Sequence, residues 1–237
     1  MTAPAFFISG AIPSNSMALA AAPRYAPHRD LVPPPSFDLR GKLGRPRNQK
    51  MQPACVSFAA CAALEYATKE DEFLAPQFVY NCRAEFMGGQ FDGMDLDNAV
   101  KIVSTWGAPK EKKYPYEEQI CRRMEIPERI FTKALKHKVA GGSLIDTIAQ
   151  AKQALIQHGP LLMDVPVYGG ANPFWQKSEG SKRLGDHCMA IVGYTPEGFT
   201  CRNSWGKHWN GDGHVILPFN DWPVVYECWC LLLLTSQ

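Results

Sequence analysis

Cys55 stands at the start of a predicted helix, where a thiol can become a nucleophile. The segment NQKMQPACVSFAACAALEY covers residues 48–66, and Pro53 suits the first turn of the helix that follows. A cysteine nucleophile needs a lowered thiol pKa, which a helix N-terminus and a nearby imidazolium both supply. Cys61 lies almost two turns further along the same helix, so we interpret it as a small core residue. Cys55 is therefore the candidate nucleophile.

His187 and Asn203 are the candidate partners of this thiol. His187 is one of six histidines and heads an apolar predicted strand in GDHCMAIVGYT, where we interpret Asp186 as exposed. Asn203 follows in RNSWG, and its amide can hold one ring nitrogen of a histidine while the other nitrogen faces the thiol. Trp205 can exclude water from that hydrogen bond. Each residue also has a purely structural interpretation: His187 as a strand-end histidine, Asn203 as a turn residue and Trp205 as a core aromatic. Together with Cys55, they predict nucleophilic acyl transfer.

Helices are predicted mainly in the first half of the chain and strands mainly in the second. Predicted helices cover residues 53–69, 96–106 and 143–157, the last opening with the capping-box-like Ser143-x-x-Asp146. Short apolar runs divided by Gly, Pro and Asn predict strands at 160–168, 187–194, 199–203, 214–219 and 228–234. This order predicts an α+β fold of two lobes, with a site in the cleft between them.

The composition argues against two classes of partner. The chain has 237 residues, of which 46% are hydrophobic and 20% charged, and its net charge is only +2. No tract of Lys and Arg stands out, so neither nucleic acid nor a membrane surface is an expected partner. No uninterrupted apolar run reaches transmembrane length.

Residues 1–35 are predicted to form an extended N-terminal arm. They lack a basic region at the start, the run PSNS at 13–16 interrupts their apolar part, and prolines are frequent after residue 22. We therefore expect no classical secretory signal, which favours an intracellular or particle-packaged protein over a secreted one. The arm is expected to dock on its own cleft or on another subunit.

Three ordered segments resemble the papain family of cysteine peptidases. NQKMQPACVSFA resembles the family's helix entry around its nucleophile, DHCMAIVGY its histidine strand, and RNSWGKHWNGDGHVIL its Asn-Ser-Trp-Gly segment. His187 and Asn203 lie about 130 and about 150 residues after Cys55, as in that family. KYPYEEQIC and HGPLLMDVPVY match weaker landmarks, and the resemblance covers residues 37–219. The compact layout is similar to bacterial or viral relatives.

The resemblance implies a fold and an activity. The fold would be a papain-like domain over residues 36–237, with a helical lobe at about 36–138 and a lobe built on an antiparallel sheet or barrel at about 139–237. The active site would lie in the cleft between the lobes. The activity would be that of an endopeptidase acting on protein or peptide substrates through a thioester, with no metal or organic cofactor.

The resemblance also implies roles for individual residues. Cys55, His187 and Asn203 would form the catalytic triad. The Cys55 N–H and the Gln49 amide would hold the oxyanion, and Trp205 would shield the contact between His187 and Asn203.

Two departures from the family pattern surround the nucleophile. Lys50 stands where the family usually has Gly, and Pro53 removes an N–H close to the expected oxyanion hole. Gln52 and Phe86 occupy both places of one family disulfide, so we expect that bridge to be absent.

Other implied sites stay open between alternatives. Cys82 and Cys121 match a second family disulfide, or else they are two buried thiols. Either Gly88 and Gly89 or Gly93 would line the substrate groove, and each of them can also be an ordinary turn glycine.

Two different functions remain as alternatives to a peptidase. A papain-like fold with altered residues around its thiol can serve as a structural component of an assembly, and an arm extended onto another chain would favour that role. Four cysteines outside the predicted catalytic site could be considered as zinc ligands: Cys188, Cys201, Cys228 and Cys230. They lack the usual spacing of zinc ligands, so we expect no zinc site.

Overall fold

The computed structural model describes residues 10–87, 92–117 and 126–234. The helices are α1 (Ser16–Ala21), α2 (Cys55–Ala67), α3 (Pro76–Met87), α4 (Leu96–Thr105), α5 (Glu128–Ala134) and α6 (Ile148–His158). The strands are β1 (Phe37–Asp38), β2 (Gly141–Leu144), β3 (Leu161–Gly169), β4 (Lys182–Tyr194), β5 (Gly198–Arg202), β6 (His214–Pro218) and β7 (Glu227–Leu232). Helices and an antiparallel sheet therefore make up the mixed fold that the sequence predicts.

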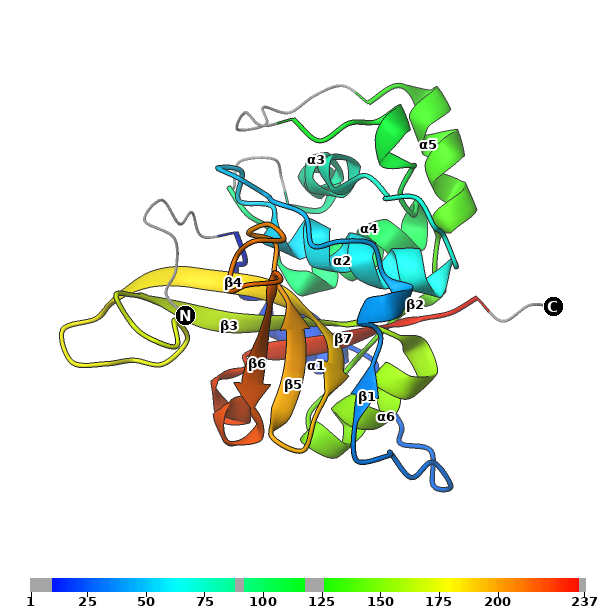
Figure 1. Cartoon of the computed structure of the whole chain (residues 1–237). Helices are drawn as coiled ribbons and strands as arrows, with labels where there is room; N and C mark the ends of the chain where they lie inside the picture. Colours follow the sequence, from blue (N-terminus) through cyan, green and yellow to red (C-terminus); the bar gives the residue numbers. More distant parts are fainter. Residues whose placement is uncertain (1–9, 88–91, 118–125, 235–237) are drawn as a thin grey trace.

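One sheet separates two apolar cores. Its strands follow the order β2-β7-β3-β4-β5-β6, with β1 added beside β4, and every pairing is antiparallel. Figure 1 shows α2 to α5 gathered on one side of the sheet and α6 on the other. Strand alternation divides the side chains of β3, because Leu162 packs in the core of α2 to α4 whereas Leu161 packs in the core of α6. The predicted lobe boundary near residues 138–139 stays a proposal, because strands after it contribute side chains to both cores.

Two predicted helices agree with the structure, and the third begins in the wrong place. The predicted helices at 53–69 and 96–106 correspond to α2 and α4. The predicted helix at 143–157 fails at its start because Ser143 belongs to β2, where it pairs with Cys230 of β7. The capping box is instead made by Thr147 and Gln150, and α6 begins at Ile148. Long-range strand pairing therefore overrides the local capping signal.

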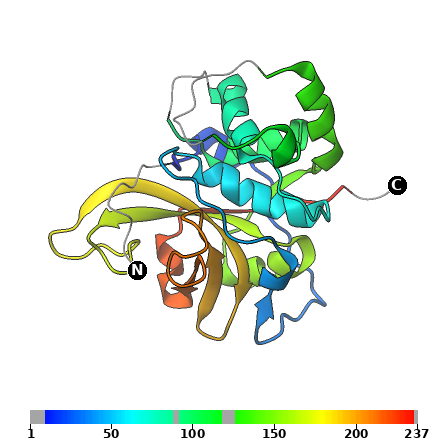
Figure 2. The same ribbon diagram turned by 45° about the horizontal axis from the view of Figure 1, so that its top comes forward.

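His187 does not stand at the head of its strand. β4 begins at Lys182, so His187 lies inside the strand, opposite Val165 of β3, and is fully buried. Asp186 is also buried rather than exposed, and its carboxylate pairs with Arg183 at 2.6 Å. In Figure 2, β3 and β4 continue together beyond the rest of the sheet, so β4 begins earlier than the sequence predicts.

The N-terminal arm is not extended throughout. Its described part contains α1, and the Asn15 side chain accepts hydrogen bonds from the first-turn N–H groups of Met17 and Ala18. None of the helices within residues 10–87, 92–117 and 126–234 has the length and apolar character needed to cross a bilayer.

Lys50 has a positive φ of 53°, which explains why glycine suits this position. Left-handed backbone costs a non-glycine residue about 1–2 kcal/mol, whereas glycine loses about 0.4–1 kcal/mol through its more flexible unfolded chain. We expect Lys50→Gly to raise the free energy of unfolding by about 0.5 kcal/mol, measured by urea denaturation. Lys42→Gly, at a residue without a positive φ, should lower it, and equal losses in both variants would contradict the strain at Lys50.

Candidate active site

The Cys55 thiol lies at the N-terminus of α2 and is fully buried. Pro53 and Ala54 lead the chain into this helix, and no side chain caps it. The Cys188 N–H of β4 donates to the Cys55 Sγ at 3.5 Å. The thiol is therefore held between the first turn of α2 and the strand that carries His187.

Asn203 fixes the orientation of His187. The His187 Nε2 lies 2.7 Å from the Asn203 Oδ1, which also accepts the Ser204 N–H at 2.7 Å. This arrangement leaves Nδ1 as the ring nitrogen that can exchange a proton with a thiol. Trp205 stacks on the imidazole, with ring centroids 4.5 Å apart and an angle of 28° between the planes. The structure thus brings together His187 of β4 with Asn203 and Trp205, which follow β5, as the sequence predicts.

Gln49 is positioned by residues on both sides of the cleft. Its side chain is 2% exposed, its Oε1 accepts from the Ser204 Oγ at 2.6 Å, and its Nε2 donates to the Gln52 carbonyl at 3.0 Å. The Gln49 N–H also donates to the Ser204 carbonyl at 2.8 Å. The amide nitrogen of Gln49 therefore points toward the turn that precedes Cys55, where an oxyanion would form.

Burial keeps the thiol and the imidazole uncharged. It raises the pKa of Cys55 to about 12, although the Cys188 N–H opposes this increase. It lowers the pKa of His187 to about 4, although the hydrogen bond to Asn203 opposes this decrease. Between these values both groups are neutral, so the pair is not in its reactive ionised state.

The N-terminal arm covers the thiol. A Cβ atom on Gly10 would lie 2.6 Å from the Cys55 Sγ and 2.9 Å from the Pro53 carbonyl carbon, so only glycine fits there. The N–H groups of Gly10 and Ala11 donate to the Asp186 carbonyl at 3.4 and 3.3 Å. Residues 10 and 11 of the arm thus lie between the Cys55 thiol and the β4 backbone of the same chain.

The arm pairs with the opposite wall of the cleft as well. The Met94 N–H donates to the Gly10 carbonyl at 3.0 Å, and the Ile12 N–H donates to the Met94 carbonyl at 3.3 Å. Gly93 has a φ of +103°, and a Cβ there would meet the Gly10 carbonyl oxygen at 3.0 Å. Gly93 therefore lines the groove that the arm occupies, whereas Gly88 and Gly89 lie outside the described residues.

Cys61 and Cys82 are buried thiols, and Cys121 lies outside the described residues. Cys61 is buried, and burial raises the pKa of its thiol. Cys82 is a buried free thiol, but Cys121 lies outside the described residues, so their disulfide stays a prediction. Within residues 10–87, 92–117 and 126–234, no three His, Cys, Asp or Glu side chains form a group that could hold a metal ion.

Two contributors to the site were missed in the sequence. Ser204 holds the Gln49 amide, and its place inside RNSWG was the available signal. Phe174 packs against Trp205 and His187, with ring centroids 5.1 and 6.1 Å apart. Phe174 lies in the loop between β3 and β4, and nothing in its neighbourhood in the sequence indicates this contact.

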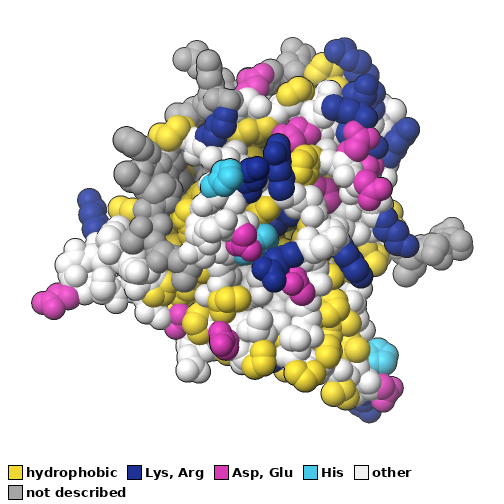
Figure 3. Space-filling view, viewed as in Figure 1, with side chains coloured by type: hydrophobic (Ala, Val, Ile, Leu, Met, Phe, Trp, Pro, Cys, Tyr) yellow, Lys and Arg dark blue, Asp and Glu magenta, His cyan; other side chains and the backbone are white. Residues whose placement is uncertain are grey.

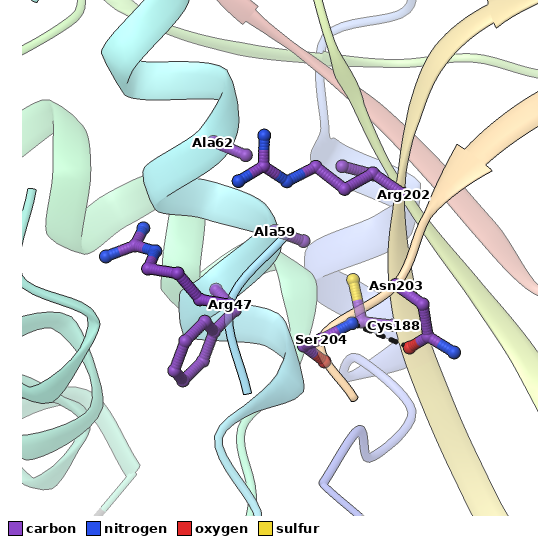
Figure 4. Close-up of a pocket in the computed structure, with 9 residues that line it drawn as sticks. Arg47, Ala59, Ala62, Cys188, Arg202, Asn203 and Ser204 are labelled. Atoms are coloured by element: carbon purple, nitrogen blue, oxygen red, sulfur yellow. Dashed lines mark hydrogen bonds between the residues drawn. The ribbon is translucent and has the colours of Figure 1, made fainter. Parts of the chain in front are cut away.

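Two arginines, the buried Arg202 and the partly buried Arg47, hold the chain segment that leads to Gln49. Figure 4 shows Arg47 and Arg202 on either side of a cavity of about 10 Å³, which has room for about one water molecule. Arg47 pairs with Glu65 at 2.9 Å and with Glu111 at 3.0 Å. Arg202 donates to two backbone carbonyls of the segment that leads to Gln49, at 2.6 and 2.7 Å. These bonds hold the segment that carries Gln49 against α2 and β5.

A second, open hollow flanks the segment of Gln49. It measures about 390 Å³ and includes Lys50, Tyr116, Lys207 and His208 in its lining. Figure 3 shows Lys, Arg and His side chains gathered around a depression near the middle of this face. This hollow therefore presents a partly basic surface beside the segment of Gln49.

Comparisons with known proteins identify the family of this chain. Residues 33–221 match the model of a family described as papain family cysteine protease. The chain is 29% identical over 187 residues to cathepsin L 2 of Paramecium tetraurelia, covering 74% of this chain and 55% of that protein. It is 27% identical over 214 residues to the probable cysteine protease RD19C of Arabidopsis thaliana, covering 76% of this chain and 55% of that protein. The chain thus spans about half the length of these curated relatives.

Solved structures show the same fold. Xylellain, a cysteine protease from Xylella fastidiosa, superposes with a TM-score of 0.84 at 19% identity, covering 95% of this chain and 96% of that one. Digestive procathepsin L 3 of Tenebrio molitor superposes with a TM-score of 0.70 at 20% identity, covering 89% of this chain and 73% of that one. With the family model matching most of its length, the chain belongs to the papain family of cysteine proteases.

Proposed function

We propose that this protein is a cysteine endopeptidase that uses Cys55, His187 and Asn203. The observation that carries the proposal is the held imidazole, with its Nε2 bonded to Asn203 and its face covered by Trp205. The adjacent residue, Cys188, bonds the Cys55 Sγ, so the same strand supports both reacting groups. Such a pair can form a thiolate and an imidazolium once water reaches it.

The proposed reaction proceeds through a thioester. The Cys55 thiolate attacks the peptide carbonyl carbon, and the Cys55 N–H and the Gln49 amide stabilise the oxyanion. The C–N bond then breaks as His187 gives its proton to the leaving amine. Water, deprotonated by His187, attacks the thioester, and the acid product leaves with the thiol restored. These steps need no group beyond the chain and water.

We also propose that the chain with its arm docked is a latent form. The arm backbone touches the Cys55 Sγ at Gly10 and bonds both walls of the cleft, so a substrate cannot enter beside it. The alternative role, a papain-like component of an assembly, is not favoured, because the described arm residues contact their own cleft.

Thiol labelling tests the proposed activity. In a variant whose arm is displaced, such as Gly10→Val, we expect an epoxide inactivator near pH 6 to modify Cys55 at least ten times faster than Cys61, because an ordinary thiol with a pKa of about 8.5 is protonated there and only Cys55 can be activated by His187. The measurement is peptide mass mapping over time, and His187→Ala should abolish the difference. If Cys55 reacts no faster than Cys61, both in the natural chain and in a variant whose arm is displaced, the proposal is wrong.

A further inference from the structure

Three carboxyl groups gather under the arm on the sheet face that carries the thiol. Asp164 of β3 lies opposite Cys188 of β4 and opposite Glu227 of β7. Directly opposed residues of antiparallel strands share a face, so these side chains lie on the side of α2. Asp186 lies two residues before Cys188 on the same face. The acidic group therefore adjoins the strand segment that bonds the Cys55 Sγ.

Asp164 is the unexplained member of this group. Its side chain is fully buried, and neither carboxyl oxygen has a hydrogen-bond partner. Burial raises the pKa of Asp164 well above its usual range, and Asp186 and Glu227 raise it further, more than Arg183 and the Val165 N–H lower it. Asp164 in turn helps to raise the pKa of Cys55, so its charge would lie close to the thiol. A buried, unpartnered carboxyl group costs about 1–3 kcal/mol and is kept mainly where it has a use.

The arm forms hydrogen bonds with Glu227, the residue that lies opposite Asp164. The Glu227 carboxylate accepts the Ser14 N–H at 2.8 Å and the Ser14 Oγ–H at 2.7 Å, and the Trp229 Nε1–H at 3.1 Å. Ser14 is part of the same arm whose Gly10 lies on the Cys55 Sγ. When the arm leaves the cleft, Glu227 loses two of these three bonds. The open cleft then contains two neighbouring carboxyl groups, Glu227 and Asp164, with too few hydrogen-bond donors for their oxygens.

Asp186 does not share this deficit. Its carboxylate is paired with Arg183 at 2.6 Å, at the edge of the group. Arg183 is itself half-exposed, and it does not bond Asp164. Among the described residues, Asp164 and Glu227 are therefore the carboxyl groups of this cluster that lack a cationic partner.

We propose that Glu227 and Asp164 form a subsite that binds a lysine or arginine side chain of the substrate. The inference rests on the proposed peptidase function, because the subsite opens into the same cleft. A guanidinium can donate in parallel to a carboxylate and still reach a second acceptor, and an ammonium can donate to both. A neutral side chain would leave both carboxyl groups unpaired. This cost would favour substrates with a lysine or arginine over substrates with a neutral side chain at that position. In the closed chain, the N–H and O–H of Ser14 take the place of the cationic donors.

Matched peptides test the subsite in the full-length chain carrying Gly10→Val, because this substitution is expected to displace the arm from the cleft. A peptide series carries either arginine or citrulline, its neutral isostere, at each of four positions before the scissile bond. We expect arginine to raise kcat/KM at least tenfold over citrulline at one position. Glu227→Gln and Asp164→Asn should each lower that ratio at least fivefold. Glu197→Gln, at an exposed carboxylate, is the matched control and should leave the ratio unchanged.

The outcomes separate the subsite from the activity. Cleavage of both peptides at equal rates at every position would overturn the subsite and leave the peptidase standing. Equal ratios in Glu227→Gln and Glu197→Gln would assign the preference to other residues. If no peptide is cleaved at all, the proposed function fails, and the subsite is then judged by binding alone.

The arm itself supplies that binding test. Ser14→Lys places an ammonium group beside Glu227, whereas Ser14→Met places a neutral chain of similar length there. We expect the lysine variant to melt at least about 2 °C above the methionine variant, and Glu227→Gln should remove the difference. Equal melting temperatures for the two Ser14 variants would overturn the cationic subsite without reference to catalysis.

Discussion

Gln49→Ala is expected to lower kcat by about 100- to 1000-fold, the usual loss when one oxyanion donor is removed. The Gln49 side chain is buried, and Ser204 and the Gln52 carbonyl fix it in one orientation. Its second amide hydrogen is therefore preorganised for an oxyanion that forms only in the transition state. The measurement is steady-state peptide cleavage by the chain carrying Gly10→Val, in which the arm is expected to leave the cleft, and KM should change little.

A second variant separates the lost donor from lost packing. Gln49→Glu keeps the size of the side chain and can still accept from the Ser204 Oγ, but as a carboxylate it has no hydrogen to donate. We expect it to lose as much kcat as the alanine variant. Alkylation of Cys55 by iodoacetamide needs no oxyanion and should stay within threefold in both. If kcat survives in Gln49→Glu, then Gln49 only packs the cleft, and another group stabilises the oxyanion.

Gly10→Val is expected to increase the rate of Cys55 labelling by about 5- to 100-fold in the full-length chain. A side chain at Gly10 would overlap the Cys55 Sγ and the Pro53 carbonyl, whose oxygen lies 3.0 Å from the Cβ position. Such overpacking costs about 1–3 kcal/mol, and the arm can escape the overlap by leaving the cleft. Water would then reach Cys55 and His187, which lowers the thiol pKa from about 12 and raises the imidazole pKa from about 4.

The matched control for this prediction is Gly41→Val. Gly41 lies in the short 3-10 helix Arg40–Lys42, and a Cβ there would meet nothing within 4 Å. Its labelling rate should equal that of the natural chain. The variant is followed by mass mapping of Cys55 and by melting, so that displacement of the arm is distinguished from unfolding. A slower reaction in Gly10→Val, with the fold intact, would mean that the docked arm does not restrict the thiol.

Local patterns were sufficient to predict most of the elements around the site. The helix at Cys55, the strand that carries His187 and the strand that ends just before Asn203 follow from apolar periodicity and from turn residues. The start of α6 could not be predicted in this way, because Ser143 pairs with β7, a strand formed by residues more than eighty positions later. Likewise, Asp186 is predicted to be exposed because it stands at the start of a predicted strand, whereas the arm and Arg183 cover it.

The sequence by itself determined which side chains are available for the chemistry: a thiol at a helix start, a histidine on a strand, and an asparagine and an indole that follow in order. Residue type and spacing carry that information, because each role needs one kind of functional group. Only the tertiary structure decided the state of those groups. Gly10 fills the space over Cys55, and Ser14 covers Glu227 beside the buried Asp164. Burial and charge proximity arise from segments that meet only after folding, so the neutral thiol, the closed cleft and its acidic wall could not be predicted from order along the chain.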